Sequence, residues 1–351
     1  MKKIISGIQQ IGIGNSDVYK IWEWYRKVFS VDVPIFDEEA EAKLMLKYTG
    51  GKARKRHAVL AINMQGGGGF EIWQYKERKP QKADFEILMG DLGIFAAKIK
   101  AKNVKKAFLN FKKRGIEIIG ELQKDPNGDD FFILKDCYGN HFQVVKGQDF
   151  FSENKDFTGG VYGAIIGVSD MEKSKNFYSD ILEYDKIIYD KTGYFKDLKN
   201  FPNGESKFRR VLLGHKKNRK GAFSELLGSS QIELIQVMDK KGRKIFKNRL
   251  WGDIGFIHLC FDVSGMKIIE KECEEKGFPF TVDSSENFDM GEAAGHFTYI
   301  EDPDETLIEF VETKKIPILK KISWYLDLRK RNPEKPLNKW VLKAMSLNRK
   351  K

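Results

Sequence analysis

A histidine and a glutamate on two strand-like segments are the first residues in this sequence that suggest chemistry. His258 lies in the stretch GFIHLCFDV at 255–263, and Glu309 lies in TLIEFV at 306–311. Successive residues of a strand face opposite sides, so one face of the strand around His258 can pack in a core while the other carries the histidine toward a cavity. An imidazole and a carboxylate on facing strands suit a divalent metal ion. The two residues are therefore candidate metal ligands.

The strand around His258 is expected to have one face for packing and one for a cavity. Simple alternation assigns the packing face to Ile257, Leu259, Phe261 and Val263 and the opposite face to Phe256, His258, Cys260 and Asp262. Cys260 thus shares a face with His258, although inert packing is the expectation for its thiol.

Length and composition indicate a soluble chain with room for two domains. It has 351 residues, 32% of them charged, and a mean hydropathy of −0.47. The sequence has no apolar run long enough to predict a membrane span. Its first residues become polar too soon for a signal peptide. The three cysteines (Cys137, Cys260 and Cys273) lack CxxC spacing, which favours a reducing compartment. We therefore expect a cytoplasmic protein.

The net charge of +12 is concentrated in the C-terminal tail. Residues 314–351 hold thirteen Lys and Arg against Asp327 and Glu334, which accounts for +11 and leaves the remaining chain near neutral. The body is therefore not expected to bind nucleic acid. The tail's apolar residues fit two amphipathic helices, docked on the body through Trp324 and Trp340 or resting on an anionic membrane surface.

A pattern of one strand, one helix and three strands recurs four times. The units span about 7–75, 93–146, 160–236 and 255–311, and the first strand after the helix is expected near 43–48 in the first unit and near 278–282 in the fourth. The helix of the first unit begins after Ser16-Asp17 and contains Trp24-Tyr25, and the helix of the third begins after Ser169-Asp170 and contains Phe177-Tyr178. Similar turns, at 136–140 and 302–305, precede the last strands of the second and fourth units. Repetition on this scale predicts four βαβββ units.

The expected fold class is α+β, with curved mixed sheets. The four units form two tandem domains, one at 1–148 and one at 158–313, and a basic helical extension occupies 314–351. Each unit is a half-open sheet, so two units must pair to enclose a cavity.

These openings and turns resemble the vicinal oxygen chelate superfamily, which includes glyoxalase I, extradiol dioxygenases and bleomycin-resistance proteins. In that family each unit offers one inward position on its first strand and one on its last. Carried onto this sequence, the positions are Gln10 and Glu71, Ala96 and Gln143, Gly163 and Glu233, and His258 and Glu309. The resemblance thus implies that the first and fourth units are equipped for a metal, whereas the second and third are not.

Two pairings of the units are open. Pairing the first unit with the fourth brings together Gln10, Glu71, His258 and Glu309, the ligand pattern of glyoxalase I. Pairing the third with the fourth gives only three ligands, as in an extradiol dioxygenase that lacks its leading histidine. The first pairing is favoured because it assembles four ligands.

The resemblance implies a metal-dependent lyase or isomerase of the glyoxalase I type. Zn, Ni, Mn, Fe and Co all suit such oxygen and nitrogen ligands. The ion would chelate a carbonyl or enediolate substrate, and Glu309, with Glu71 opposite, would transfer the proton. The alternatives are a metal-free, resistance-type protein that sequesters a small molecule and an atypical dioxygenase. Beyond a small-molecule substrate, the sequence allows a monomer or homodimer.

Overall fold

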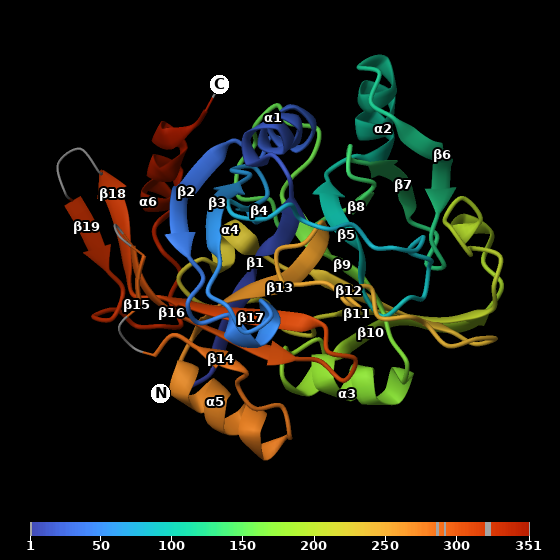
Figure 1. The fold of residues 1–351 in the computed structure, drawn as a ribbon. Helices are drawn as coiled ribbons and strands as arrows, with labels where there is room; N and C mark the ends of the chain where they lie inside the picture. The colour runs from blue at the N-terminus through green and yellow to red at the C-terminus, as the bar shows by residue number, and fades with distance from the viewer. Residues whose placement is uncertain (1, 286–287, 291–292, 320–323, 351) are drawn as a thin grey trace.

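A computed structural model describes residues 2–285, 288–290, 293–319 and 324–350 of the chain (Figure 1). The first two units contain β1 (Ile4–Asn15), α1 (Val18–Phe29), β2 (Val33–Glu41), β3 (Lys55–Ile62), β4 (Gly69–Tyr75), β5 (Gly93–Ala101), α2 (Val104–Lys113), β6 (Ile118–Lys124), β7 (Asp130–Lys135) and β8 (His141–Lys146). The last two contain β9 (Val161–Gly167), α3 (Met171–Asp180), β10 (Lys186–Gly193), β11 (Phe208–Gly214), α4 (Ser224–Leu227), β12 (Gln231–Val237), β13 (Gly255–Ser264), α5 (Met266–Glu275), β14 (Val282–Asp283), β15 (Phe288–Met290), β16 (Ala293–Glu301) and β17 (Leu307–Thr313). The chain is therefore α+β, as expected.

The four units pair in a crossed order. One nine-stranded sheet has the order β14-β16-β17-β13-β1-β4-β3-β2, with β15 paired to β16, and joins the fourth unit to the first. An eight-stranded sheet, β10-β11-β12-β9-β5-β8-β7-β6, joins the third to the second. The central contacts are antiparallel pairs of first strands, β1 with β13 and β5 with β9. The pairing favoured from the sequence, first unit with fourth, is therefore confirmed.

Hydrogen bonds between the repeated motifs connect pairs of units that the sheets do not join. Tyr25 on α1 donates to Asp136, in the turn before β8, at 2.7 Å, and Tyr178 on α3 donates to Asp302, in the turn before β17, at 3.0 Å. The first bond joins the first unit to the second and the other joins the third unit to the fourth, whereas the sheets join the first unit to the fourth and the second to the third. In Figure 1, α1 and α2 accordingly lie at one side of the molecule and α3 and α5 at the opposite side.

One hydrophobic core joins both sheets to the four repeat helices. It takes in Tyr25 from α1, Phe111 from α2, Phe177 from α3 and Ile269 from α5, and the inner face of each central strand. Two smaller clusters lie on the opposite faces of the sheets, one around Trp251 and one around Phe95. Polar residues on these opposite faces are thus screened from solvent without belonging to the main core.

Two strands differ from the sequence-based expectation. The second strand of the first unit is β2 at 33–41, and the stretch expected as a strand, 43–48, contains a 3-10 turn at Leu46–Tyr48 instead. Within the described part of the chain, β2 is an edge strand that pairs with β3 alone, so its acidic residues need no apolar alternation and the sequence pattern does not indicate a strand there. The strand expected near 278–282 is reduced to the two residues of β14.

The tail is docked on the body through Leu337, Val341 and Leu342. Its first half is a hairpin of β18 (Lys315–Leu319) and β19 (Trp324–Asp327), where the pattern predicted a helix, and its second half contains α6 (Lys339–Ala344). Leu337 and Leu342 are buried against the body, whereas Trp340 is 58% exposed; the side chain of Trp324 lies outside the described residues. Membrane contact by this tail stays a prediction. Among the described helices, none has the length and apolar character needed to cross a bilayer.

Candidate metal centre

Four neighbouring strands of the nine-stranded sheet carry the residues expected to bind a metal. Strands β17, β13, β1 and β4 lie side by side, and they hold Glu309, His258, Gln10 and Glu71 in that order. Strand register aligns Gly12 with both His258 and Glu71, and Cys260 with Glu309. The first and fourth units therefore converge on one point of the sheet.

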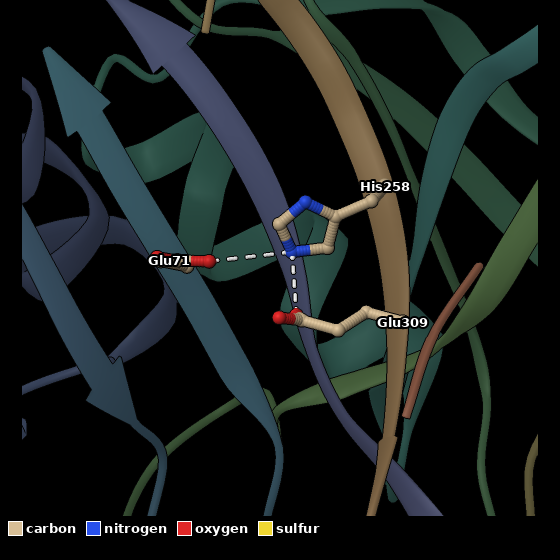
Figure 2. Close-up of side chains that lie close together, drawn as sticks. All are labelled: Glu71, His258 and Glu309. Atoms are coloured by element: carbon tan, nitrogen blue, oxygen red, sulfur yellow. Dashed lines mark ion pairs between the residues drawn. The ribbon is translucent and has the colours of Figure 1, made fainter. Parts of the chain in front are cut away.

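The histidine lies between the two carboxylates (Figure 2). Nε2 of His258 is 3.1 Å from Oε2 of Glu309 and 3.3 Å from Oε2 of Glu71. Neither contact has hydrogen-bond geometry, and both nitrogens of this fully buried imidazole are without a hydrogen-bond partner among the residues that the structure describes. A buried polar atom without a partner is costly, so this point of the structure suits a further ligand.

Gln10 reaches the same cluster because β1 is irregular. The pairing of β1 with β13 shifts between Ile8 and Gln10, and both Gln9 and Gln10 line the adjoining cavity. The side-chain amide of Gln10 donates to Oε2 of Glu309 at 3.4 Å, while its own oxygen is buried and unpaired. The side-chain oxygen of Gln10 is therefore a fourth candidate metal ligand, beside His258 and the two carboxylates.

A second irregularity, next to His258, corrects the expected faces of its strand. The register jumps from His258 opposite Gly12 to Phe256 opposite Ile13, which leaves Ile257 as an extra residue. Phe256 consequently packs in the main core and Ile257 on the other side, the reverse of simple alternation. Leu259 and Phe261 keep their expected core face.

Gly12 makes room for the imidazole. A Cβ on Gly12 would lie 2.4 Å from Cε1 and 2.8 Å from Nε2 of His258, closer than such atoms can approach. The ring therefore lies flat against the backbone of β1, where only glycine is accommodated.

Aromatic side chains enclose the site. The Trp251 ring is nearly parallel to His258 with centroids 6.3 Å apart, and Tyr299 meets the imidazole edge to face at 5.5 Å. Trp251, Tyr299, Glu71 and Glu309 all border a cavity of about 360 Å³. The carboxylates thus open into a space that can hold a small molecule.

Charge and burial shift several pKa values here. Burial lowers the pKa of His258, but Glu309 and Glu71 outweigh this effect and raise it to about 9. Burial and the neighbouring carboxylates raise the pKa of Tyr299 and of Cys260 well above their usual values. Cys260 is fully buried as a thiol, as expected of an inert packing residue.

The donor set fits a divalent metal ion. Glu71, His258 and Glu309 each offer a ligand atom, and these atoms lie within 4.8 Å of one another. Bonds of about 2.0–2.2 Å at right angles would separate neighbouring donors by about 3 Å, close to the spacings around Nε2. One nitrogen and carboxylate or amide oxygens suit Zn, Mn, Fe, Co or Ni. Within the described residues this is the single cluster of this kind.

The eight-stranded sheet has positions that correspond to the four candidate ligands, but a different set of residues stands there. Gln143 is aligned with Lys98, and Glu233 with Ile165, so the first-strand positions two residues earlier are Ala96 and Gly163. A Cβ on Gly163 would lie 1.6 Å from a backbone oxygen, which excludes a side chain there. This centre therefore lacks both first-strand ligands, as expected from the sequence.

Lys98 supplies the positive charge in that second centre. Its buried ammonium donates to Gln143 at 2.6 Å and to Glu233 at 2.7 Å. The guanidinium of Arg210 donates to the other oxygen of Glu233 at 2.7 and 2.9 Å, and Tyr189 donates to it at 2.8 Å. Burial raises the pKa of Glu233, but Lys98 and Arg210 outweigh this and lower it to about 2. Glu233 is thus a structural carboxylate.

The remaining histidines lie outside the cluster, as expected. His141 stacks on Phe95 at 4.8 Å, and burial lowers its pKa to about 3. His57 contacts Asp37 at 2.7 Å, and His296 contacts Asp283 at 2.5 Å. His215 lies 2.9 Å from the backbone oxygen of Glu183. Each has a local structural contact.

Comparison with known families decides the identity of the fold. The model of the Glyoxalase/Bleomycin resistance protein/Dioxygenase superfamily matches residues 7–144 and 162–310, most of the chain. The chain belongs to this superfamily. A comparison with curated proteins found no match.

Solved structures of the superfamily share this fold at low sequence identity. A putative dioxygenase from Bacillus subtilis is similar with a TM-score of 0.55 and 12% identity, over 89% of this chain and 86% of that one. A mutant of glyoxalase I from Zea mays is similar with a TM-score of 0.51 and 13% identity, over 89% of this chain and 92% of that one. Identities this low support the shared fold and carry no specific activity.

Several residues of the two centres escaped the sequence analysis. Lys98 could have been suspected, because it follows Ala96 on the same strand face between apolar neighbours. Tyr299 aligns with Glu309 on the strand before the last, a position that repeats alone do not single out. Trp251 lies in the connection between β12 and β13, outside any repeated element.

Proposed function

We propose that the chain is a divalent-metal-dependent lyase or isomerase of the glyoxalase I type that moves a proton on a small molecule with two adjacent oxygens. One observation carries the proposal. Among the described residues, His258 has no hydrogen-bond partner for either nitrogen, yet two carboxylates flank its Nε2 beside a cavity and the amide of Gln10 contacts one of them. Gln10, Glu71, His258 and Glu309 would hold the ion.

When bound, the ion would supply Lewis acidity to the two substrate oxygens. The chain's own residues supply the rest. Glu309 is largely buried and borders the cavity, so its carboxylate can accept a proton from a carbon next to those oxygens. Glu71, on the other side of Nε2, is placed to return the proton to the neighbouring carbon. The aromatic walls exclude water from the exchange.

A proton-exchange experiment tests this proposal. The metal-loaded protein should exchange the carbon-bound hydrogen of an α-hydroxyketone for deuterium in D₂O, observed by NMR. Glu309→Gln keeps an oxygen donor but removes the base, so exchange should fall by at least about 100-fold while the metal content is unchanged. A His141→Ala variant, altered at a buried histidine of the other sheet, is the control. Unchanged exchange in Glu309→Gln would contradict the role of this residue.

A metal-free binding protein is the second candidate, and one observation favours it. The pKa of His258 is raised to about 9, so a protonated imidazole can itself balance one of the two carboxylates at neutral pH. A protein that takes up no divalent ion but still binds small apolar molecules would support this candidate. Oxygen consumption by the iron-loaded protein would instead support an atypical dioxygenase.

A further inference from the structure

The cavity beside the proposed metal centre is small and lined mainly by apolar residues. Its volume of about 360 Å³ is at the small end of the roughly 300–1,000 Å³ typical of ligand pockets. Its described lining includes Gln10, Glu71 and Glu309 at the centre and apolar residues from several elements: Phe36, Ala42, Leu44, Met45, Leu60, Trp251, Phe297, Tyr299 and Val311. A compact ligand with an apolar body would fill this space.

Several apolar residues of the cavity lining are buried. Leu60 is directly opposite Glu71 on β3, and it is 3% exposed. Met45, Trp251 and Tyr299 belong to one buried cluster that borders the cavity. A ligand whose oxygens reach the centre must therefore place its adjoining atoms against apolar surface, where a charged group would lose its hydration.

The cations in the described lining are already paired. The guanidinium of Arg56 lies 2.8 Å from the carboxylate of Glu38, and it also donates to the backbone oxygen of that residue at 3.3 Å. Lys43 is 75% exposed in its side chain, and it lies 3.8 Å from Glu41. A carboxylate on the ligand would thus have to displace an existing partner to gain a cation.

The balance of charge around the cavity also opposes an anionic ligand. Four carboxylates (Glu38, Glu41, Glu71 and Glu309) face two cations (Lys43 and Arg56) in the described lining. A divalent ion would bring this lining to neutrality, which leaves no positive field for further negative groups.

We infer that the substrate is a compact, uncharged molecule whose aromatic or branched apolar body carries the two adjacent oxygens, and that polyanionic conjugates are rejected. This inference rests on the proposed function, because the metal is what would hold the two oxygens. Leu60 and Met45 would be the residues that set the specificity.

Three hydroxamates that chelate a metal through the same two oxygens test the inference. Acetohydroxamate has a methyl body, benzohydroxamate a phenyl body, and 4-carboxybenzohydroxamate a charged phenyl body. Calorimetric titration of the Zn²⁺-loaded protein should show benzohydroxamate binding at least tenfold more tightly than acetohydroxamate. The carboxylated compound should bind no more tightly than acetohydroxamate.

Variants identify the surface responsible. Leu60→Asn should reduce the advantage of the phenyl body to less than about threefold while acetohydroxamate binding persists, which also reports an intact fold and centre. Met45→Gln, in a loop rather than a strand, tests the same surface if Leu60→Asn does not fold. Phe201→Ala, in the apolar cluster of the other sheet, should leave the ratio unchanged.

The outcomes distinguish a wrong substrate class from a wrong metal-dependent function. Equal binding of the three compounds, or tightest binding of the carboxylated one, would overturn the substrate class and leave the metal-dependent function standing. Failure of all three compounds to bind the loaded protein would overturn the proposed function and this inference with it.

Discussion

In the nine-stranded sheet, the carboxylates of Glu71 and Glu309 face an imidazole, whereas in the eight-stranded sheet Glu233 faces the ammonium of Lys98. The two centres occupy the same place in the repeat, at the contact between two first strands. One borders a cavity and has unpaired polar atoms, and the other has its charges joined by short hydrogen bonds.

The difference shows two ways to stabilise buried carboxylates on one scaffold. A buried negative charge needs a counter-charge, because desolvation is costly. In the second centre the chain supplies that charge through Lys98 and Arg210. In the first centre, the ion pairs of Glu71 and Glu309 within the described residues are with His258 alone. A bound cation would provide there what Lys98 provides in the other sheet.

Removing Glu233 should have the largest effect on folding. Glu233→Ala leaves the buried cations of Lys98 and Arg210 without their shared carboxylate, and breaking such a pair costs about 3–5 kcal/mol. Urea titration followed by circular dichroism measures the loss in the free energy of unfolding.

The matched variant in the other sheet should behave differently. Glu71→Ala in metal-free protein should change the free energy of unfolding by less than about 1 kcal/mol, because Glu309 still faces His258. Metal affinity in this variant should fall more than about 100-fold, beyond the loss expected for residues that only support a ligand. Equal destabilisation by the two variants would remove the distinction between the centres.

Acid should weaken the second centre within a defined pH window. The pKa of Glu233 is lowered from 4.5 to about 2, so this carboxylate stabilises the fold above pH 4.5. That contribution should disappear as the pH falls from about 4.5 to about 2. The free energy of unfolding, measured across this range, should fall less steeply in Glu233→Gln than in the natural protein. Parallel pH profiles would contradict the role assigned to Glu233.

A single methyl group should disturb the first centre without unfolding the chain. Gly12→Ala would place a Cβ 2.4 Å from the His258 ring, so the imidazole must move away from the carboxylates. Metal affinity should fall at least tenfold, as measured by competition with a coloured chelator. Gly193→Ala is the control, since a Cβ there meets nothing within 4 Å, and it should leave the affinity unchanged.

Much of the fold and of the first centre follows from the sequence because the relevant signals are local or repeated. The strand–helix openings and the turns at Asp136 and Asp302 mark the four units, and His258 and Glu309 stand out on apolar strands. Gln10 and Glu71 are implied by the resemblance to the superfamily, which assigns one inward position to the first strand and one to the last strand of each unit. The crossed pairing was favoured because it alone brings all four residues together.

The features that were missed depend on partners far away in the chain. Lys98 is buried because Glu233 from another unit pairs with it, and a lysine in a strand otherwise indicates a solvent-facing position. Gly12 matters because His258 packs on it. The extra residue at Ile257 reverses the faces of one end of β13, which alternation cannot reveal. The tail hairpin forms where the apolar spacing also fits a helix.

Metal content tests the central claim most directly. After equilibration with Zn²⁺, Mn²⁺, Co²⁺ or Ni²⁺ and removal of free ion, elemental analysis should find one divalent ion per chain. It should find none in the double variant His258→Ala with Glu309→Ala, and one in His141→Ala, the control with an intact first centre. A natural protein that retains no ion, or a double variant that keeps its ion, would contradict the assignment of this centre.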